Sequence, residues 1–362
     1  MTKKTRVGLI FGGNSSEYEV SIVSGGNIYD AIDKDKFEVH PIWITNEGYI
    51  ASEADSFKVL QDPTYQVENP KKVANLANLT ELAGRPEIDI FFPIVHGNLG
   101  EDGVLQGLFR LLNKPFVGDD VLAAAVTMDK EMTKILASRV GVPVSKWVAI
   151  KRPEYNDAGN AKLDYAQVSA QLGTSDLFVK PSNQGSSVGI SHVQQAVDYA
   201  PALAEAFKFD DKVLVEEAID GTEVETAVLG NDDPQVSGVG QIINQKGTWY
   251  SYDNKYAGDS TTTLQIPADL PESVVETVRE QALKVYQVTE CSGLSRIDSM
   301  LRTSDHKVIF NELNALPGFT NISMYPKLFE AAGISYSDLI TKLLAYGQAR
   351  FDHKATLLHK HD

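Results

Sequence analysis

The chain has almost no cysteine and fewer basic than acidic side chains. Its 362 residues include one cysteine, Cys291, which excludes an internal disulfide framework and a zinc site built from several cysteines. With 33 Lys and Arg against 49 Asp and Glu, the formal charge is −16, and no basic tract is present to bind a phosphate backbone. We therefore expect no nucleic-acid partner.

Long apolar segments are also missing. No run approaches the roughly 18 residues needed to cross a bilayer, and the apolar stretch 7–11 is too short for the hydrophobic part of a signal peptide. We predict a cytoplasmic protein without membrane insertion. At roughly 150 residues per domain, the length predicts two or three domains.

The first part of the chain alternates between strands and helices. Apolar strands are expected near 5–11, 37–44 and 88–95, and the last is nearly continuous, as in parallel sheets that are buried on both faces. His96 follows this strand, where open parallel sheets bind ligands, although it could also only brace its loop. The turn Gly12-Gly13 lacks the dinucleotide-binding pattern, and Glu17 beyond it either caps a helix or pairs with a substrate ammonium.

The composition changes near Met128. We divide the chain into an N-terminal α/β domain (1–128), a central α+β unit (129–230) and a C-terminal unit (231–362). The C-terminal unit contains a polar, aromatic and glycine-bearing segment, 245–262, which is typical of a long functional loop.

Two predicted strands carry the clearest chemical signal. Residues 296–301 and 307–314 should pair as a hairpin, and residues two apart on a strand share a face. Arg296, Asp298, Glu312 and Asn314 would then gather on one side. Two carboxylates and an amide oxygen suit Mg²⁺ or Mn²⁺, and the arginine suits an anion held by such ions. The alternative is a solvent-facing hairpin with ordinary charges.

A lysine and a glycine–serine loop form a second signal. Lys180 precedes the loop 182–189, in which Gly185 and Gly189 allow unusual backbone angles and Ser186 and Ser187 offer hydroxyl donors. The order is not that of a Walker loop, so a plain surface turn is an equal alternative. Lys130 and Lys255 are candidate companions for a polyphosphate, although each alone is usually a solvated surface lysine.

Eight segments, in order, resemble the D-alanine–D-alanine ligases of the ATP-grasp superfamily. They cover nearly the whole chain: FGGNSSEYEVS (11–21), VHGNLGEDGVLQG (95–107), Met128-Asp129-Lys130, FVKPSNQGSSVGI (178–190), VLVEEAIDGTE (213–223), DNKYAG (253–258), SRIDSML (295–301) and NELNALPGFTNISMYP (311–326). The resemblance implies a mixed α/β and α+β, three-domain ATP-grasp fold with an N-terminal parallel-sheet (pre-ATP-grasp) domain. It also implies a homodimer and a role in peptidoglycan precursor synthesis.

The implied reaction joins two D-alanines with ATP through a D-alanyl phosphate. The resemblance implies that Asp298, Glu312 and Asn314 hold two Mg²⁺ or Mn²⁺ ions and that Arg296 and the Gly318 N–H stabilise the oxyanion. Glu17 would bind the first ammonium, joined to Ser186 and Tyr256, while His96 and Ser323 would meet the substrates. The implied ATP contacts are Lys130, Lys180, Ser187, Glu216, Glu217, Ile219, Glu223 and Lys255.

Two alternatives remain open at this point. One is a D-alanine–D-lactate ligase, which the tyrosine in DNKYAG disfavours, because related depsipeptide-forming enzymes carry phenylalanine or a different loop there. The other is a regulator that binds nucleotide without catalysis, which is disfavoured because the lysines, the metal ligands and Arg296 are all present. A dehydrogenase would rest only on Gly12-Gly13.

Overall fold

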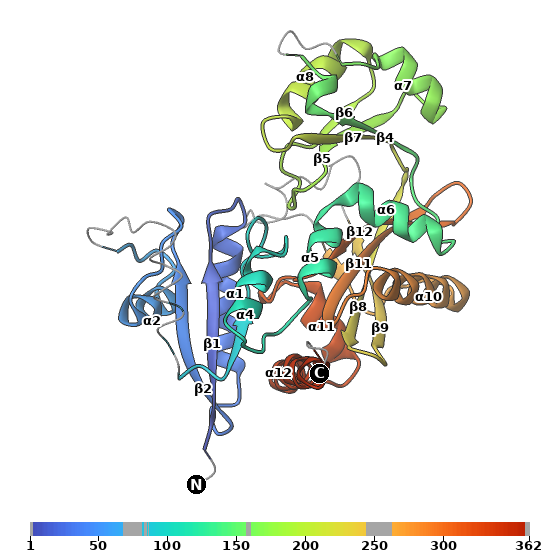
Figure 1. The fold of residues 1–362 in the computed structure, drawn as a ribbon. Helices are drawn as coiled ribbons and strands as arrows, with labels where there is room; N and C mark the ends of the chain where they lie inside the picture. Colours follow the sequence, from blue (N-terminus) through green and yellow to red (C-terminus); the bar gives the residue numbers. More distant parts are fainter. Residues whose placement is uncertain are drawn as a thin grey trace.

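Three β-sheets organise the chain (Figure 1). The structure is a computed structural model that describes residues 3–67, 82, 85, 87–156, 161–243 and 263–358. No helix in these ranges is long and apolar enough to cross a bilayer.

The N-terminal sheet is parallel, as the apolar runs predict. β1 (Thr5–Gly12) lies between β2 (Phe37–Ile44) and β3 (Ile90–Pro93). Val7 and Leu9 of β1 belong to one apolar cluster and Ile10 to another, so both faces of the strand are buried. The helices of this part are α1 (Tyr18–Ala31), α2 (Glu53–Gln61), α4 (Val104–Leu111) and α5 (Val121–Met128).

The central sheet is antiparallel and has its own core. Its order is β4-β7-β5-β6, formed by β4 (Trp147–Lys151), β7 (Lys212–Glu217), β5 (Leu177–Pro181) and β6 (Ser191–Val193). The helices α7 (Tyr165–Leu172) and α8 (Ala196–Ala206) pack against it through a separate apolar cluster that includes Val179, Leu203 and Val215. A 3-10 turn, Arg152–Glu154, follows β4.

The third sheet is antiparallel in the order β10-β9-β8-β11-β12. It contains β8 (Gly221–Gly230), β9 (Gln235–Ile243), β10 (Thr263–Gln265), β11 (Gly293–Arg302) and β12 (Val308–Asn314). The predicted hairpin is confirmed, with Arg296 opposite Asn314 and Asp298 opposite Glu312. β8 pairs with β9 and β11, so residues 221–230 lie in this sheet although the boundary at 230 groups them with the central unit.

Helices connect the third sheet to the N-terminal domain. α6 (Lys130–Arg139) and α10 (Glu272–Val288) pack near β12. α11 (Met324–Ala331) and α12 (Tyr336–Ala355) come after β12 in the sequence, and α12 contacts β3 of the N-terminal sheet. One apolar cluster contains residues of β1 and β3 together with Phe319 and the inner face of α12. The rings of Phe92 and Phe319 meet edge to face at 6.2 Å. The first and third sheets therefore share a core, which fixes the loops that lie between them.

Candidate active site

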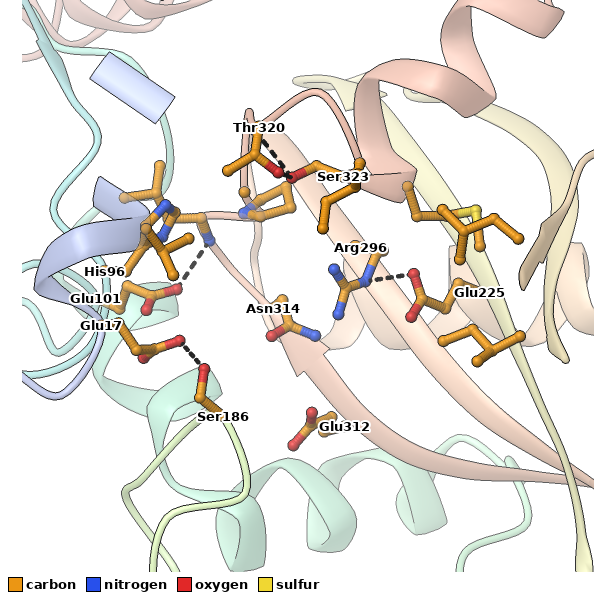
Figure 2. Close-up of a pocket in the computed structure, with 18 residues that line it drawn as sticks. Glu17, His96, Glu101, Ser186, Glu225, Arg296, Glu312, Asn314, Thr320 and Ser323 are labelled. Atoms are coloured by element: carbon orange, nitrogen blue, oxygen red, sulfur yellow. Dashed lines mark hydrogen bonds and ion pairs between the residues drawn. The ribbon is translucent and has the colours of Figure 1, made fainter. Parts of the chain in front are cut away.

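A polar cavity of about 110 Å³ lies where the N-terminal domain, the 182–189 loop and the third sheet meet (Figure 2). Glu17, His96 and Glu101 line it from the N-terminal domain, and Ser186 lines it from the loop. The third sheet and the segment after it supply Arg296, Glu312, Asn314, Gly318 and Ser323. The structure thus brings together, around one cavity, eight of the 18 residues that the sequence singles out.

Arg296 and Asp298 form the most tightly bound charge pair in the site. The guanidinium donates to both carboxylate oxygens of Asp298, each at 2.7 Å, and Asn314 Nδ2 donates to Asp298 Oδ2 at 2.8 Å. Arg296 Nε also lies 3.0 Å from Glu225 Oε2 (Figure 2). Burial opposes the charge of Arg296, but Asp298 and Glu225 outweigh it and raise its pKa well above the ordinary value. The arginine therefore stays cationic beside the cavity.

Carboxylates from β8 add to this group. Oxygen atoms of Glu223, Glu225 and Asp298 lie within 4.8 Å of one another, because Glu225 sits directly opposite Asp298 in the β8–β11 ladder. Together with Glu312 and Asn314 they form a set of hard oxygen donors, which is the ligand type that Mg²⁺ and Mn²⁺ prefer. The donor chemistry of this face therefore fits a divalent cation.

Lys130 connects the third sheet with the 182–189 loop. Its Nζ lies 3.3 Å from Glu312 Oε2 and donates to the backbone oxygen of Gln184 at 2.5 Å. Lys130 is the first residue of α6 and its side chain is only 10% exposed, so it is not a solvated surface lysine. A cation in this position can face a phosphate that lies under the loop.

A buried network surrounds Glu216 at the end of β7. Its Oε2 lies 3.0 Å from Lys180 Nζ and 3.3 Å from Lys134 Nζ, and it accepts from Ser145 Oγ at 3.1 Å. Burial disfavours the carboxylate, but Lys134 and Lys180 outweigh it and lower the pKa of Glu216. Its Oε1 is buried and has no hydrogen-bond partner among the described residues. A buried acceptor of this kind suits a ligand that donates a hydrogen bond.

Glu17 and Ser186 join the N-terminal domain to the central unit. Ser186 Oγ donates to Glu17 Oε1 at 2.5 Å (Figure 2). A Cβ built at Gly185 would lie 2.9 Å from Glu17 Oε2, so a larger residue there would displace the Glu17 carboxylate. Glu17 is the N-cap residue of α1, but its side chain makes no capping hydrogen bond, so the carboxylate is directed to Ser186 and not to the helix end.

The segment after β12 places Gly318 and Ser323 at the cavity wall. Ser323 Oγ accepts from Thr320 N at 2.9 Å and lies 2.8 Å from Thr320 Oγ1. A Cβ at Gly318 would lie 2.8 Å from Ser323 Oγ, so glycine is what allows this approach. Gly318 and Ser323 therefore line the same part of the cavity.

His96 is buried beside α1. Its Nε2 lies 3.4 Å from Ser24 Oγ, and its backbone oxygen accepts from Ser15 Oγ at 2.8 Å. Burial lowers the pKa of His96, so the ring is neutral near pH 7. The residue both lines the cavity and braces its loop.

The remaining predicted residues differ in backbone conformation, burial and hydrogen bonding. Ser187 adopts a positive φ of 60° in the loop, Ile219 is half-buried, and Glu217 accepts from the backbone N–H of Lys146 at 2.8 Å. Lys255 and Tyr256 lie outside the described residues.

Comparisons with known proteins account for this arrangement. Residues 6–119 match the family model for the D-ala D-ala ligase N-terminus, and residues 136–345 match that for the C-terminus. The chain is 76% identical to the D-alanine–D-alanine ligase of Lactobacillus delbrueckii subsp. bulgaricus over the full length of both chains. The chain belongs to the D-alanine–D-alanine ligase family.

Solved structures of ligases support the assignment. The Coxiella burnetii D-alanine–D-alanine ligase is 32% identical, with 97% of each chain covered and a TM-score of 0.78. The VanG D-Ala:D-Ser ligase of Enterococcus faecalis is 34% identical, with 95% of this chain and all of that chain covered and a TM-score of 0.78. These similarities confirm the mixed α/β ATP-grasp fold class that the resemblance predicts.

Three charged residues in or near the cavity could not be singled out from the sequence. Glu101, Lys134 and Glu225 all lie within or next to quoted motifs or predicted elements, yet no spacing argument distinguishes them from surface charges. Loss of solvent, with the nearby charge of Glu17, raises the pKa of Glu101 to about 8. Burial lowers the pKa of Lys134 to about 8, against the opposing effect of Glu216. Only the packing of distant segments reveals these environments.

Lys134→Met tests the buried network. The variant removes a side chain that is fully buried and pairs with Glu216, and we expect the KM for ATP to rise by about 10-fold, equivalent to about 1.4 kcal/mol. The KM for D-alanine should change little. Lys208→Met, which removes an exposed lysine paired with Glu205, is the control. An unchanged KM for ATP in the Lys134 variant would show that the network around Glu216 does not contribute to ATP binding.

Proposed function

We propose that the cavity is the site where two D-alanine molecules are joined with ATP. The family activity is ATP-dependent formation of D-alanyl-D-alanine, which is used to build peptidoglycan precursors. The observation that carries the residue-level proposal is the convergence of Arg296, Glu17 and the Gly318 segment on one cavity. Each of the three has a different proposed role in the reaction.

In the first half-reaction, a carboxylate oxygen of the first D-alanine attacks the γ-phosphorus of ATP. The bond from phosphorus to the bridging oxygen breaks, and ADP and D-alanyl phosphate form. Catalysis of such a step is mostly positioning and charge neutralisation. Lys130 and Lys180 supply cations for the phosphates, with Lys255 proposed from the sequence. Glu216, Glu217, Ile219 and Glu223 are the proposed contacts to adenine and ribose, and Ser187 is a proposed phosphate contact.

Asp298, Glu312 and Asn314 are the proposed ligands for divalent cations, with two Mg²⁺ or Mn²⁺ as the count expected from the resemblance. Bound there, such ions neutralise phosphate charge and orient the nucleotide. The oxygen-rich face formed with Glu223 and Glu225 supports this assignment.

Glu17 is the proposed partner of the first ammonium, and Ser186 holds its carboxylate in place. Tyr256 is proposed from the sequence to complete this group. His96, neutral and buried, lines the same side of the cavity. These contacts orient the first substrate and exclude water, which would otherwise hydrolyse the acyl phosphate.

In the second half-reaction, the neutral amine of the second D-alanine attacks the acyl carbon. The new carbon–nitrogen bond forms, the amine loses a proton, and the bond to phosphate breaks. Arg296 and the Gly318 N–H are the proposed donors that stabilise the oxyanion, a role worth about 10²–10³ in rate per donor. Ser323 is the proposed partner of the second carboxylate.

The deciding assay is ADP release with ATP, Mg²⁺ and D-alanine, with L-alanine as the control. We expect release that depends on D-alanine and a stoichiometric dipeptide product. ATP binding without release would favour the non-catalytic regulator. A competition between D-alanine and D-lactate across pH tests the lactate alternative, since only the amine must lose a proton to become a nucleophile.

The metal assignment has its own test. Asp298→Asn and Glu312→Gln should each lower kcat by at least about 100-fold, because each removes a charged oxygen ligand. Unchanged melting temperatures would show that the fold is intact, and the concentration of Mg²⁺ or Mn²⁺ for half-maximal activity should rise. Exposed Asp305→Asn on the β11–β12 turn is a suitable control. Near-normal activity of both variants would refute the assignment.

We further propose a homodimer formed through α4 and α5. Val104 and Leu111 of α4 are 55% and 87% exposed, and Leu122 of the neighbouring α5 is 57% exposed. An exposed group of large apolar side chains is typical of an interface. Sedimentation velocity should show a dimer that Leu111→Asp converts to monomer; a monomeric wild type would contradict the proposal.

A cytoplasmic location remains our proposal for the enzyme. The single buried cysteine fits a reducing compartment, and ATP is the substrate. The division into units at residues 128 and 230 also remains a proposal, with β8 structurally part of the third sheet.

A further inference from the structure

The segment 315–320 carries the proposed oxyanion donor, yet side chains of the N-terminal domain hold it. Glu101 Oε1 accepts from Leu316 N at 3.2 Å (Figure 2). Its other oxygen accepts from Gly97 N at 2.6 Å. One carboxylate thus bridges two backbone segments that are more than 200 residues apart in sequence. Leu316 is only two residues before Gly318.

Two further side chains hold the other end of the segment. Ser24 Oγ of α1 accepts from Phe319 N at 3.1 Å, and Asn27 Nδ2 donates to Phe319 O at 3.0 Å. Phe319 itself is fully buried against Phe92. The backbone on both sides of Gly318 is therefore fixed from α1 and from the loop after β3.

We propose that Glu101 and Ser24 are positioning residues that aim the Gly318 N–H at the oxyanion of the second half-reaction. This inference rests on the proposed function of the cavity. The reason is geometric: an oxyanion donor acts only if it is held where charge develops, and a displacement of about 1 Å can cost roughly 100-fold in rate. Gly318 has no side chain with which to hold itself, so its orientation depends on its neighbours.

Glu101 also lies beside Glu17, the proposed ammonium partner, and both line the cavity. The same loop therefore contacts the first substrate's site and the oxyanion segment. A loop that contacts both places suits the proposed reaction, because the acyl phosphate of the first substrate must be attacked by the amine before water reaches it.

The adjacent residue provides a matched control. Asp102 accepts two backbone N–H groups, from Leu99 at 2.9 Å and Val104 at 3.0 Å, but both belong to its own loop and helix. For Ser24 the control is Ser56, which is equally buried and accepts from Trp43 N at 3.0 Å within the N-terminal domain. The controls lose similar hydrogen bonds without touching the segment 315–320.

The experiment compares ADP release and dipeptide formation in full-length Glu101→Ala, Ser24→Ala, Asp102→Ala and Ser56→Ala. We expect the first two to lower dipeptide formation by about 10- to 100-fold. ADP release should fall less, because acyl phosphate that is not attacked by the amine is hydrolysed, so the ratio of dipeptide to ADP drops. The KM for ATP should stay within about 2-fold. The controls should keep the wild-type ratio.

Several outcomes would overturn the inference. If Glu101→Ala and Ser24→Ala keep the wild-type ratio of dipeptide to ADP, or if activity follows melting temperature equally in all four variants, the two residues do not aim Gly318. Should Glu101→Ala fail to fold, Ser24→Ala alone decides. Wild-type protein that releases no ADP with D-alanine would instead refute the proposed function, which separates the two failures.

Discussion

The register of β11 between β8 and β12 is the constraint on which the site depends. It sets Asp298 opposite both Glu225 and Glu312, and Arg296 opposite Asn314. A shift of one residue in either ladder would turn these side chains to the other face of the sheet. Several acidic groups can occupy one buried face only because Arg296 lies among them and its guanidinium binds Asp298 and Glu225. The same positive charge that permits their burial also lines the cavity.

Cations from other segments complete this balance. Lys130 pairs with Glu312, and Lys134 and Lys180 share Glu216. An enzyme with a net charge of −16 that binds a triphosphate must concentrate its positive side chains locally. The lysines come from α6 and β5, which belong to different layers, so the proposed nucleotide site lies between structural units and is not formed by one sheet. Their low exposure means that each cation is held by a counter-charge and not by solvent.

The pattern of apolar residues and the spacing of turns were sufficient to predict some strands and not others. The hairpin that carries Asp298 and Glu312 could be predicted because strand alternation and a polar turn define its pairing. The parallel N-terminal sheet follows similarly from its apolar runs. The place of β8 could not be deduced, since an antiparallel strand of 221–230 fits either neighbouring sheet until its partner is known. Glu101 and Ser24 were missed for a related reason: their function depends on Leu316 and Phe319, which are distant in sequence. The roles of Tyr256 and Lys255 rest on the resemblance alone.

The apolar cluster that spans the first and third sheets has a consequence for the architecture as a whole. Val7 and Leu9 share it with Leu339 and Leu343, so the N-terminal sheet and α12 are stabilised by one apolar core, whereas the central sheet has a core of its own. Removing α12 would expose apolar side chains of β3 and α1, the two elements of the N-terminal domain against which it packs. The packing of the N-terminal sheet is therefore completed by a helix that lies far from it in sequence.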